Sequence, residues 1–273
     1  MIEFIKYILL GLLQGIAEVL PISSSGHLAI AGAIFSLQDD NLAFEVFLHL
    51  ASLIAVLAFL IKPIIKLVKG CFLYVFKKNK DYAFEFKYLL FLIISTIPIV
   101  VFTIIMKLLG YDASPIYLIG ICLIVNAIML FFLTRFVGTR KKEEMTFLDA
   151  LIIGLFQCAG MFPGISRSGS CLCGAFTRKI DKTDAADYAF MLFIPSVVGA
   201  FVLEAGNIGA IFTMDSKMIP CYIAAFLVAA VTTYYAFKVL LAIIKKGKLS
   251  YFSIYCVIVG IFAIVYSGLN GWI

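Results

Sequence analysis

The sequence predicts an all-α protein that crosses a membrane several times. Of its 273 residues, 63% are hydrophobic and only 14% are charged, whereas soluble domains are about 45–50% apolar and about 25% charged. A water-soluble fold of this length could not bury so much apolar surface, because its surface-to-volume ratio is too high. Six apolar runs are each long enough to cross about 30 Å of hydrocarbon. We therefore expect a single membrane domain over residues 1–273. The six predicted transmembrane helices are residues 43–62, 87–109, 115–137, 184–204, 218–240 and 250–270.

Two further apolar segments are interrupted and cannot cross the membrane as simple helices. Residues 2–36 are broken by Pro21 and a run of serines, and residues 146–178 are broken by Pro163-Gly164 and a second polar run. Each break would leave backbone N–H and C=O groups unsatisfied in lipid, and such backbone is tolerated only inside protein or along a watery cavity. We therefore expect two re-entrant helix–loop–helix hairpins.

The basic residues predict the orientation of the protein in the membrane. If the first hairpin enters and leaves on the outer side, eighteen of the 22 Lys and Arg residues fall on the inner side, as the positive-inside rule requires. Both termini then lie outside. The net charge of +6 is thus explained by membrane topology, and we expect no nucleic-acid partner.

This layout also predicts an inverted-topology repeat, with repeat 1 over residues 1–140 and repeat 2 over residues 141–273. Each half holds one hairpin and three spans, and the two halves begin on opposite sides of the membrane. Several residues of the first hairpin recur 143 positions later in the second. The matching pairs are Gly11 and Gly154, Leu12 and Leu155, Gln14 and Gln157, Ser23 and Ser166, Ser25 and Ser168, and Gly26 and Gly169. We therefore expect the two hairpin tips to meet near the membrane midplane.

The first hairpin carries groups suited to proton transfer and metal binding. Gln14 and Glu18 are four residues apart and share one face of a helix, which then leads into the loop that holds Ser23, Ser24 and His27. A carboxylate inside a membrane is costly and therefore indicates a functional site by default. The alternative is that Glu18 is merely paired and that the serines only satisfy the end of a kinked helix.

The second hairpin carries groups suited to binding phosphate. Arg167 lies between Ser166 and Ser168, with Gly169 following, at the start of an apolar helix. Glycine exposes backbone N–H groups, a helix start adds partial positive charge, and arginine can bind two phosphate oxygens at once. The alternative is a structural arginine that pairs with Glu18. An acidic tip facing a cationic tip predicts a site for a phosphate ester.

A third pair of ionisable residues lies in the first full span, where Glu45 and His49 share a helix face. They could support the site or bind a second ion. They could equally well only satisfy one another, because ionisable residues inside membranes usually find partners.

These motifs resemble the signature sequences of the undecaprenyl-diphosphate phosphatase (bacitracin-resistance, BacA/UppP) family, and the resemblance covers essentially the whole chain. The similar stretches are Gln14-x-x-x-Glu18, the run from Pro21 to His27 and the run from Pro163 to Gly169. The resemblance implies a bacterial plasma-membrane hydrolase that converts undecaprenyl diphosphate to undecaprenyl phosphate and phosphate. This reaction recycles the lipid carrier for peptidoglycan synthesis and confers bacitracin resistance. It also implies an active site open to the outer face and a divalent cation, Mg²⁺ or Ca²⁺.

The resemblance implies a role for each residue of the site. Ser24 would be the nucleophile, assisted by His27, while Glu18 would act in catalysis and, together with Gln14, in metal binding. The phosphate-binding positions would be Ser23, Ser166, Arg167, Ser168 and Gly169. The chain departs from the family pattern at Cys171, where the family usually shows Thr, and a thiol is a poor hydrogen-bond partner. Gln14 is a neutral amide and hence a weaker ligand than a carboxylate.

Several alternatives stay open at the level of sequence. A phosphoserine intermediate and direct attack by water would use the same residues, and either His27 or Glu18 could take the proton. The rival function is a lipid-carrier flippase or secondary transporter, because inverted repeats with broken helices are also typical of transporters. A transporter, however, would not need a nucleophile beside a proton acceptor. The expected partners are the lipid substrate and membrane lipid, and the sequence leaves a homo-oligomer open.

Overall fold

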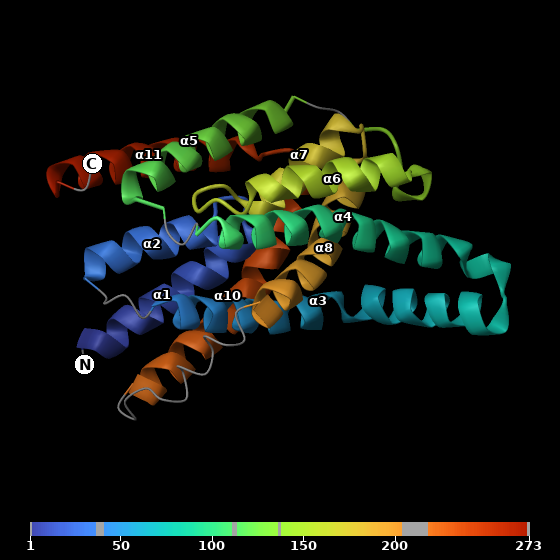
Figure 1. The fold of residues 1–273 in the computed structure, drawn as a ribbon, viewed down its shortest axis with the longest axis horizontal. Helices are drawn as coiled ribbons and strands as arrows, with labels where there is room; N and C mark the ends of the chain where they lie inside the picture. Colours follow the sequence, from blue (N-terminus) through green and yellow to red (C-terminus); the bar gives the residue numbers. More distant parts are fainter. Residues whose placement is uncertain (1, 37–40, 111–113, 136–137, 204–217, 272–273) are drawn as a thin grey trace.

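The computed structural model shows a bundle of α-helices (Figure 1). It describes residues 2–36, 41–110, 114–135, 138–203 and 218–271. Within these ranges, six helices are long and apolar enough to cross a membrane, which confirms the six predicted spans. They are α3 (Asn41–Lys77), α4 (Ala83–Leu108), α5 (Ile116–Leu133), α8 (Lys182–Leu203), α10 (Ile219–Lys245) and α11 (Ser250–Leu269).

The first span is longer than predicted. We expected it to end at residue 62, but α3 continues through Pro63 to Lys77, which makes it about 55 Å long at 1.5 Å per residue. The additional turns pack against α4, where Gly70 lies against the side chain of Glu85. This packing explains why a single proline, which removes only one backbone hydrogen bond, does not end the helix. Figure 1 shows the pair of helices projecting to one side of the bundle.

Four further helices come from the two interrupted segments. They are α1 (Ile2–Val19) and α2 (Ser24–Phe35) in the first, and α6 (Phe147–Ala159) and α7 (Arg167–Thr177) in the second. Both interruptions fall where they were predicted, because serine caps the helix that follows. Ser23 accepts a hydrogen bond from the backbone of Gly26, and Ser166 accepts one from the backbone of Gly169. The re-entrant course of these helices in a membrane stays a prediction.

The open end of each interrupted pair is closed by a polar contact. Lys6 Nζ donates to the carbonyl oxygen of Phe35 over 3.0 Å and so joins the start of α1 to the end of α2. Arg178 Nε donates to Asp149 Oδ1 over 2.6 Å and joins the end of α7 to the start of α6. Residues 6 and 149 lie 143 positions apart, as do residues 35 and 178, so the two contacts occupy matching places.

Glycines allow close helix packing at matching places in the two halves. A Cβ atom on Gly11 would lie 2.3 Å from a backbone oxygen of α10, and one on Gly154 would lie 2.5 Å from a backbone oxygen of α4. Helices α5 and α11 cross at Gly120 and Gly260, where a Cβ on either glycine would lie 2.7 Å from the carbonyl oxygen of the other. Small residues at such crossings are typical of helix packing in membranes.

Candidate active site

The two helix interruptions touch in the interior of the bundle, as predicted. Ser23 Oγ accepts a hydrogen bond from the backbone nitrogen of Gly164 over 3.0 Å. A Cβ atom on Gly26 would lie only 2.8 Å from the same nitrogen, so glycine is needed for this approach. The serine-rich turn and the arginine-bearing turn therefore form one site, although they are far apart in the sequence.

Asn126 of α5 ties the two interruptions together. Its Nδ2 donates to the carbonyl oxygen of Pro21 over 2.9 Å, and its Oδ1 accepts from the backbone nitrogen of Ser166 over 3.1 Å. The side chain is fully buried. Sequence analysis did not single out this residue. The available signal was its position as the only amide side chain in the apolar run 115–137, because a polar group there needs a partner.

Ser23 adopts a strained backbone conformation that His27 stabilises. Its φ of +72° lies in the left-handed region, which costs a residue with a Cβ atom about 1–2 kcal/mol. His27 Nδ1 lies 2.7 Å from the carbonyl oxygen of Ser23 and must carry a hydrogen, because a carbonyl only accepts. Nε2 of the same ring then accepts from the hydroxyl of Tyr255 over 2.9 Å. Both ring nitrogens of His27 are thus occupied by groups other than Ser24.

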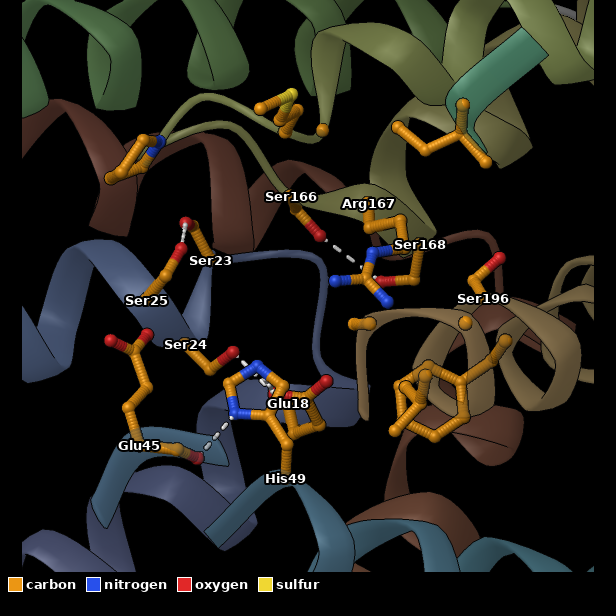
Figure 2. Close-up of a pocket in the computed structure, with 18 of the residues that line it drawn as sticks. Glu18, Ser23, Ser24, Ser25, Glu45, His49, Ser166, Arg167, Ser168 and Ser196 are labelled. Atoms are coloured by element: carbon orange, nitrogen blue, oxygen red, sulfur yellow. Dashed lines mark hydrogen bonds and ion pairs between the residues drawn. The ribbon is translucent and has the colours of Figure 1, made fainter. Parts of the chain in front are cut away.

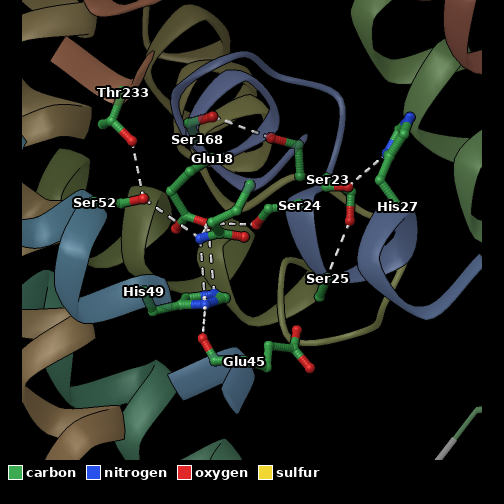
Figure 3. A network of polar contacts seen from close by, with 12 residues as sticks. Glu18, Ser23, Ser24, Ser25, His27, Glu45, His49, Ser52, Ser168 and Thr233 are labelled. Carbon is green, nitrogen blue, oxygen red and sulfur yellow. Dashed lines mark hydrogen bonds and ion pairs between the residues drawn. The ribbon is translucent and has the colours of Figure 1, made fainter. Parts of the chain in front are cut away.

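Glu18 is the centre of a polar network (Figure 3). Its Oε2 accepts a short hydrogen bond from Ser24 Oγ and a second one, of 2.8 Å, from Gln14 Nε2. His49 Nε2 lies 3.5 Å from the same oxygen, and the Glu18 side chain is only 5% exposed. The hydroxyl of Ser24 is therefore held against a carboxylate that can take its proton.

His49 of α3 belongs to this network, although the sequence left its role open. Its Nδ1 lies 2.9 Å from the carbonyl oxygen of Glu45, so this nitrogen carries a hydrogen. Nε2 faces the carboxylate of Glu18, and a proton must lie between them because two lone pairs would otherwise face each other. His49 therefore places a positive or proton-sharing group beside Glu18.

Arg167 faces the cavity from the side opposite Glu18 (Figure 2). It is the first residue of α7 and lies between Ser166 and Ser168, whose hydroxyl oxygens are 3.0 Å apart. Its Nη1 atom is buried and has no hydrogen-bond partner in the described ranges. The alternative of a structural pair with Glu18 is not observed among those residues, since Glu18 pairs with His49. A buried cationic donor without an acceptor suits an anionic oxygen.

A cavity of about 300 Å³ separates the two groups of polar residues. Ser23, Ser24 and Glu18 line it on one side, and Ser166, Arg167 and Ser168 line it on the other. The rest of the wall includes α3, which contributes Glu45, Val46, His49 and Leu50, and α4 and α8, whose lining residues are largely apolar. The cavity therefore combines a hydroxyl nucleophile, a carboxylate and a guanidinium with a hydrocarbon surface, which matches a ligand with an anionic end and an apolar end.

Three predicted site residues lie outside the lining of this cavity. Gln14 is fully buried behind Glu18, and His27 faces Tyr255. The backbone nitrogen of Gly169 donates to Ser166 Oγ over 3.1 Å and so caps α7. Each of these residues acts on the site indirectly, through a hydrogen bond with a residue that lines the cavity.

The predicted metal pair, Gln14 and Glu18, is only part of a ligand set. The described ranges contain no cluster of three His, Cys, Asp or Glu residues that could hold a metal ion. Gln14 Oε1 is nevertheless buried without a hydrogen-bond partner in that part of the chain, and the amide of this residue already contacts the Glu18 carboxylate. Two adjacent oxygen groups suit a hard cation that takes its other ligands from phosphate and water.

The second half repeats part of this arrangement without the carboxylate. Gln157, the counterpart of Gln14, is fully buried and accepts from Ser196 Oγ over 3.3 Å and from Cys171 Sγ over 3.4 Å. Met161 stands at the place that matches Glu18. Cys171 thus makes only a weak S–H contact where a threonine would offer a stronger hydroxyl donor.

Comparison with known proteins shows the family to which the chain belongs. The family model described as bacitracin resistance protein BacA matches residues 7–262. The chain belongs to the BacA family. Among similar proteins, the "Undecaprenyl-diphosphatase 3" of Bacillus anthracis is 34% identical over 263 residues, which cover 96% of this chain and 97% of the relative. The "Undecaprenyl-diphosphatase" of Bacteroides fragilis is 36% identical over 273 residues, which cover 98% of this chain and 100% of the relative. These matches extend over both helix interruptions.

Proposed function

We propose that this protein hydrolyses undecaprenyl diphosphate to undecaprenyl phosphate and inorganic phosphate. The names of its relatives support this substrate. The observation that carries the proposal is that Ser24, bonded to Glu18, shares one cavity with Arg167, whose Nη1 has no hydrogen-bond partner among the described residues. This arrangement places a nucleophile and its base opposite an anion-binding group. A transporter would need only the anion-binding group, so the geometry favours hydrolysis.

In the proposed reaction, Ser24 Oγ attacks the terminal phosphorus while its proton passes to Glu18 Oε2, to which it is already bonded. The new bond joins Oγ to phosphorus, and the bond from phosphorus to the bridging oxygen breaks. Undecaprenyl phosphate leaves with that electron pair. Water then attacks the phosphoserine, releases inorganic phosphate and restores the hydroxyl. Arg167 and the N-terminus of α7 would stabilise the charge on the transferred group.

We assign the supporting histidine role to His49 and not to His27. His49 Nε2 faces the carboxylate of Glu18, so its positive charge would stabilise the ionised form that accepts the proton of Ser24. The ring of His27 is bonded to the Ser23 carbonyl and to Tyr255. Its proposed role is to hold the left-handed turn that presents Ser24.

A divalent cation, Mg²⁺ or Ca²⁺, is part of the proposal. The carboxylate of Glu18 and Oε1 of Gln14 would hold it, together with oxygens of the diphosphate and water. Such an ion would neutralise part of the diphosphate charge when bound. The unpartnered oxygen of Gln14 supports this assignment.

We further propose an inverted repeat in the bacterial plasma membrane, with both termini and the cavity opening on the outer face. The contact of Lys6 with Phe35 and that of Asp149 with Arg178 lie at matching positions of the two halves and support the repeat. The distribution of Lys and Arg supports the orientation. On that face the enzyme would recycle the lipid carrier for cell-wall synthesis and so confer bacitracin resistance.

The test is release of phosphate from undecaprenyl diphosphate by the purified protein with Mg²⁺ or Ca²⁺ present. Ser24→Ala and Arg167→Ala should each reduce turnover by about 10³-fold or more, as expected when a nucleophile or an essential charge is removed. Trapping a phosphorylated Ser24 by acid quench would support the covalent route, and its absence would favour attack by water.

Two variants serve as matched controls. Thr134→Ala removes a hydroxyl that, within the described part of the chain, donates to the carbonyl of Phe131, and Arg135→Ala removes a guanidinium that lies over the ring of Phe131. Both should retain full activity. Normal turnover in Ser24→Ala and Arg167→Ala would reject the site, and binding of the lipid without any phosphate release would favour the transporter.

A further inference from the structure

The cavity has an apolar half that the proposed chemical steps do not use. Ile99 and Thr103 of α4 and Val197 and Gly199 of α8 line this half. Neither helix brings charge to it, because residues 88–106 and 188–203 contain no Asp, Glu, Lys or Arg. A hydrocarbon surface beside a phosphate site suits a ligand whose phosphate is esterified to an apolar chain.

Helices α4 and α8 contact each other at one end of this apolar half. Farther along the chain, both helices line the cavity. At the contact, Ser95 Oγ lies 2.6 Å from the hydroxyl of Tyr188, and the rings of Tyr88 and Tyr188 meet edge to face. Each helix then contains an internal proline, Pro98 in α4 and Pro195 in α8. Proline is the commonest cause of bends in helices, and the cavity lies along the turns that follow these two.

Gly199 faces open space in this part of α8. Among the described residues, no heavy atom lies within 4 Å of a Cβ atom built on it. The helical glycines Gly11 and Gly154 differ, because a Cβ on either would overlap a neighbouring backbone. Glycine destabilises a helix interior. A helical glycine that has no close neighbour therefore indicates that the protein requires the space beside it to stay open.

The outer surfaces of both helices are apolar where the cavity lies between them. Val101 of α4 is 49% exposed and Val198 of α8 is 46% exposed, and Ile104 and Val202 are also exposed. A hydrocarbon chain that passed between the helices would therefore move from the cavity into the lipid phase without crossing a polar layer.

We infer that the polyprenyl chain of the substrate leaves the cavity sideways between α4 and α8. Its first isoprene units then lie against Ile99, Thr103, Val197 and Gly199, while the diphosphate lies between Ser24 and Arg167. This inference rests on the proposed function, and it adds the path by which a membrane-bound lipid reaches a buried site.

Substitution of Gly199 tests this path. Gly199→Trp fills the open space, so it should lower kcat/KM for undecaprenyl diphosphate by about tenfold or more, a usual factor when a pocket rejects part of a ligand. Hydrolysis of inorganic diphosphate, which has no isoprene unit, should stay unchanged. Ile258→Trp, at an exposed position of α11 outside the cavity lining, is the matched control and should leave both substrates unaffected.

An unchanged rate of Gly199→Trp on the long substrate would overturn the inference, as would an equal loss on both substrates. A second measurement uses the unsubstituted protein and a polyprenyl diphosphate with a diazirine in its first isoprene unit. Light should attach the probe to peptides that contain residues 97–104 or 196–202. Label confined to α5, α10 or α11 would exclude the path. If the unsubstituted protein cleaves neither substrate, the proposed function fails, while the labelling still reports where the chain lies.

Discussion

Three consecutive serines have different partners at the first interruption. Ser23 caps α2 and accepts from the backbone of Gly164, and Ser25 lies 3.4 Å from the Ser23 hydroxyl. Only Ser24 bonds to Glu18. The left-handed backbone of Ser23 reorients the chain between α1 and α2, so that the next hydroxyl faces a carboxylate near the end of the preceding helix. The direction of the Ser24 hydroxyl, and hence its reactivity, thus depends on the backbone conformation of Ser23.

The two histidines should respond differently to substitution. His49→Gln removes the imidazole beside Glu18 and should lower kcat by about 10²-fold, a typical contribution of acid–base groups, with little change in melting temperature. His27→Ala removes two hydrogen bonds from the Ser23 turn and should destabilise the fold by about 2 kcal/mol, with a smaller loss of kcat. Turnover and thermal melting of both variants in detergent would check this.

The opposite pattern would return the catalytic role to His27. His27→Ala would then lose turnover at unchanged stability, and His49→Gln would retain it. A conservative variant, His27→Gln, keeps a side-chain donor and should recover part of the lost stability.

The sequence predicted which polar residues belong to the site better than it predicted where their side chains point. Gln14 and Glu18 were predicted to share a helix face and do so, because both lie in one regular helix. His27 lies beyond the left-handed turn at Ser23, so helical periodicity could not predict where its ring points. Asn126 has hydrogen-bond partners 105 and 40 positions away, and a single sequence contains no sign of such contacts.

Among the helices, the second interrupted pair is fixed most firmly at its open end. Asp149 is fully buried and accepts from Arg140, Arg178 and Thr146. Burial raises the pKa of the Asp149 carboxyl, but the hydrogen bonds from these three residues outweigh burial and hold its pKa well below the usual range. The start of α6 and the end of α7 are therefore held together by charged, hydrogen-bonded groups, and Arg167 lies at the opposite end of the pair.

Removing the Asp149 carboxylate should destabilise the protein in a pH-dependent way. Asp149→Asn should cost about 3 kcal/mol, the lower end for a broken buried ion pair, because the side chains of Arg140 and Arg178 are 29% and 33% exposed. Since folding lowers the pKa of Asp149, its contribution is complete above about pH 4, the unfolded value, and declines as the pH falls toward the folded pKa. Melting curves of both proteins from pH 8 to pH 3 would check this.

A constant difference in melting temperature between pH 8 and pH 5, followed by convergence at lower pH, is the expected result. Convergence already at neutral pH would contradict the assignment of Asp149 as an ionised anchor. Glu143→Gln, a change at a nearby acid, is the control and should shift the melting temperature little, as is usual for surface substitutions.

Helix positions followed from the sequence more closely than helix lengths. Both interruptions were predicted from proline, glycine and serine, residues that act locally on the backbone. The end of α3 was predicted too early, because Pro63 and the first lysines are local stop signals, whereas the packing of Gly70 on Glu85 is a tertiary contact. Local signals therefore located the site, and tertiary packing determined how far the helices around it extend.

At the scale of the whole molecule, the helices pair across the two halves. Helix α1 packs on α10 and α6 packs on α4, while α5 and α11 pack on each other. An inverted repeat predicts this exchange of partners. It also predicts that loops at equivalent positions of the two halves lie on opposite sides of the membrane.

Cysteine labelling in intact cells checks the orientation. Lys80→Cys, in the loop between α3 and α4, should react with a membrane-impermeant maleimide only after the membrane is opened. Asn270→Cys, just after α11, should react in intact cells. The unsubstituted protein, whose seven cysteines are buried or half-buried, provides the background. Reaction of Lys80→Cys from outside would reverse the proposed topology.

Asn126 limits how far the two halves can move against each other. Rocking one half about the other would part Asn126 from the backbone nitrogen of Ser166 and break that hydrogen bond in a buried interior, where each unsatisfied group costs about 1–3 kcal/mol. A cycle of alternating exposure would meet this barrier on every turn. The same restraint favours bond cleavage, because the attacking oxygen of Ser24 and the guanidinium of Arg167 then keep their spacing while the long lipid binds and leaves.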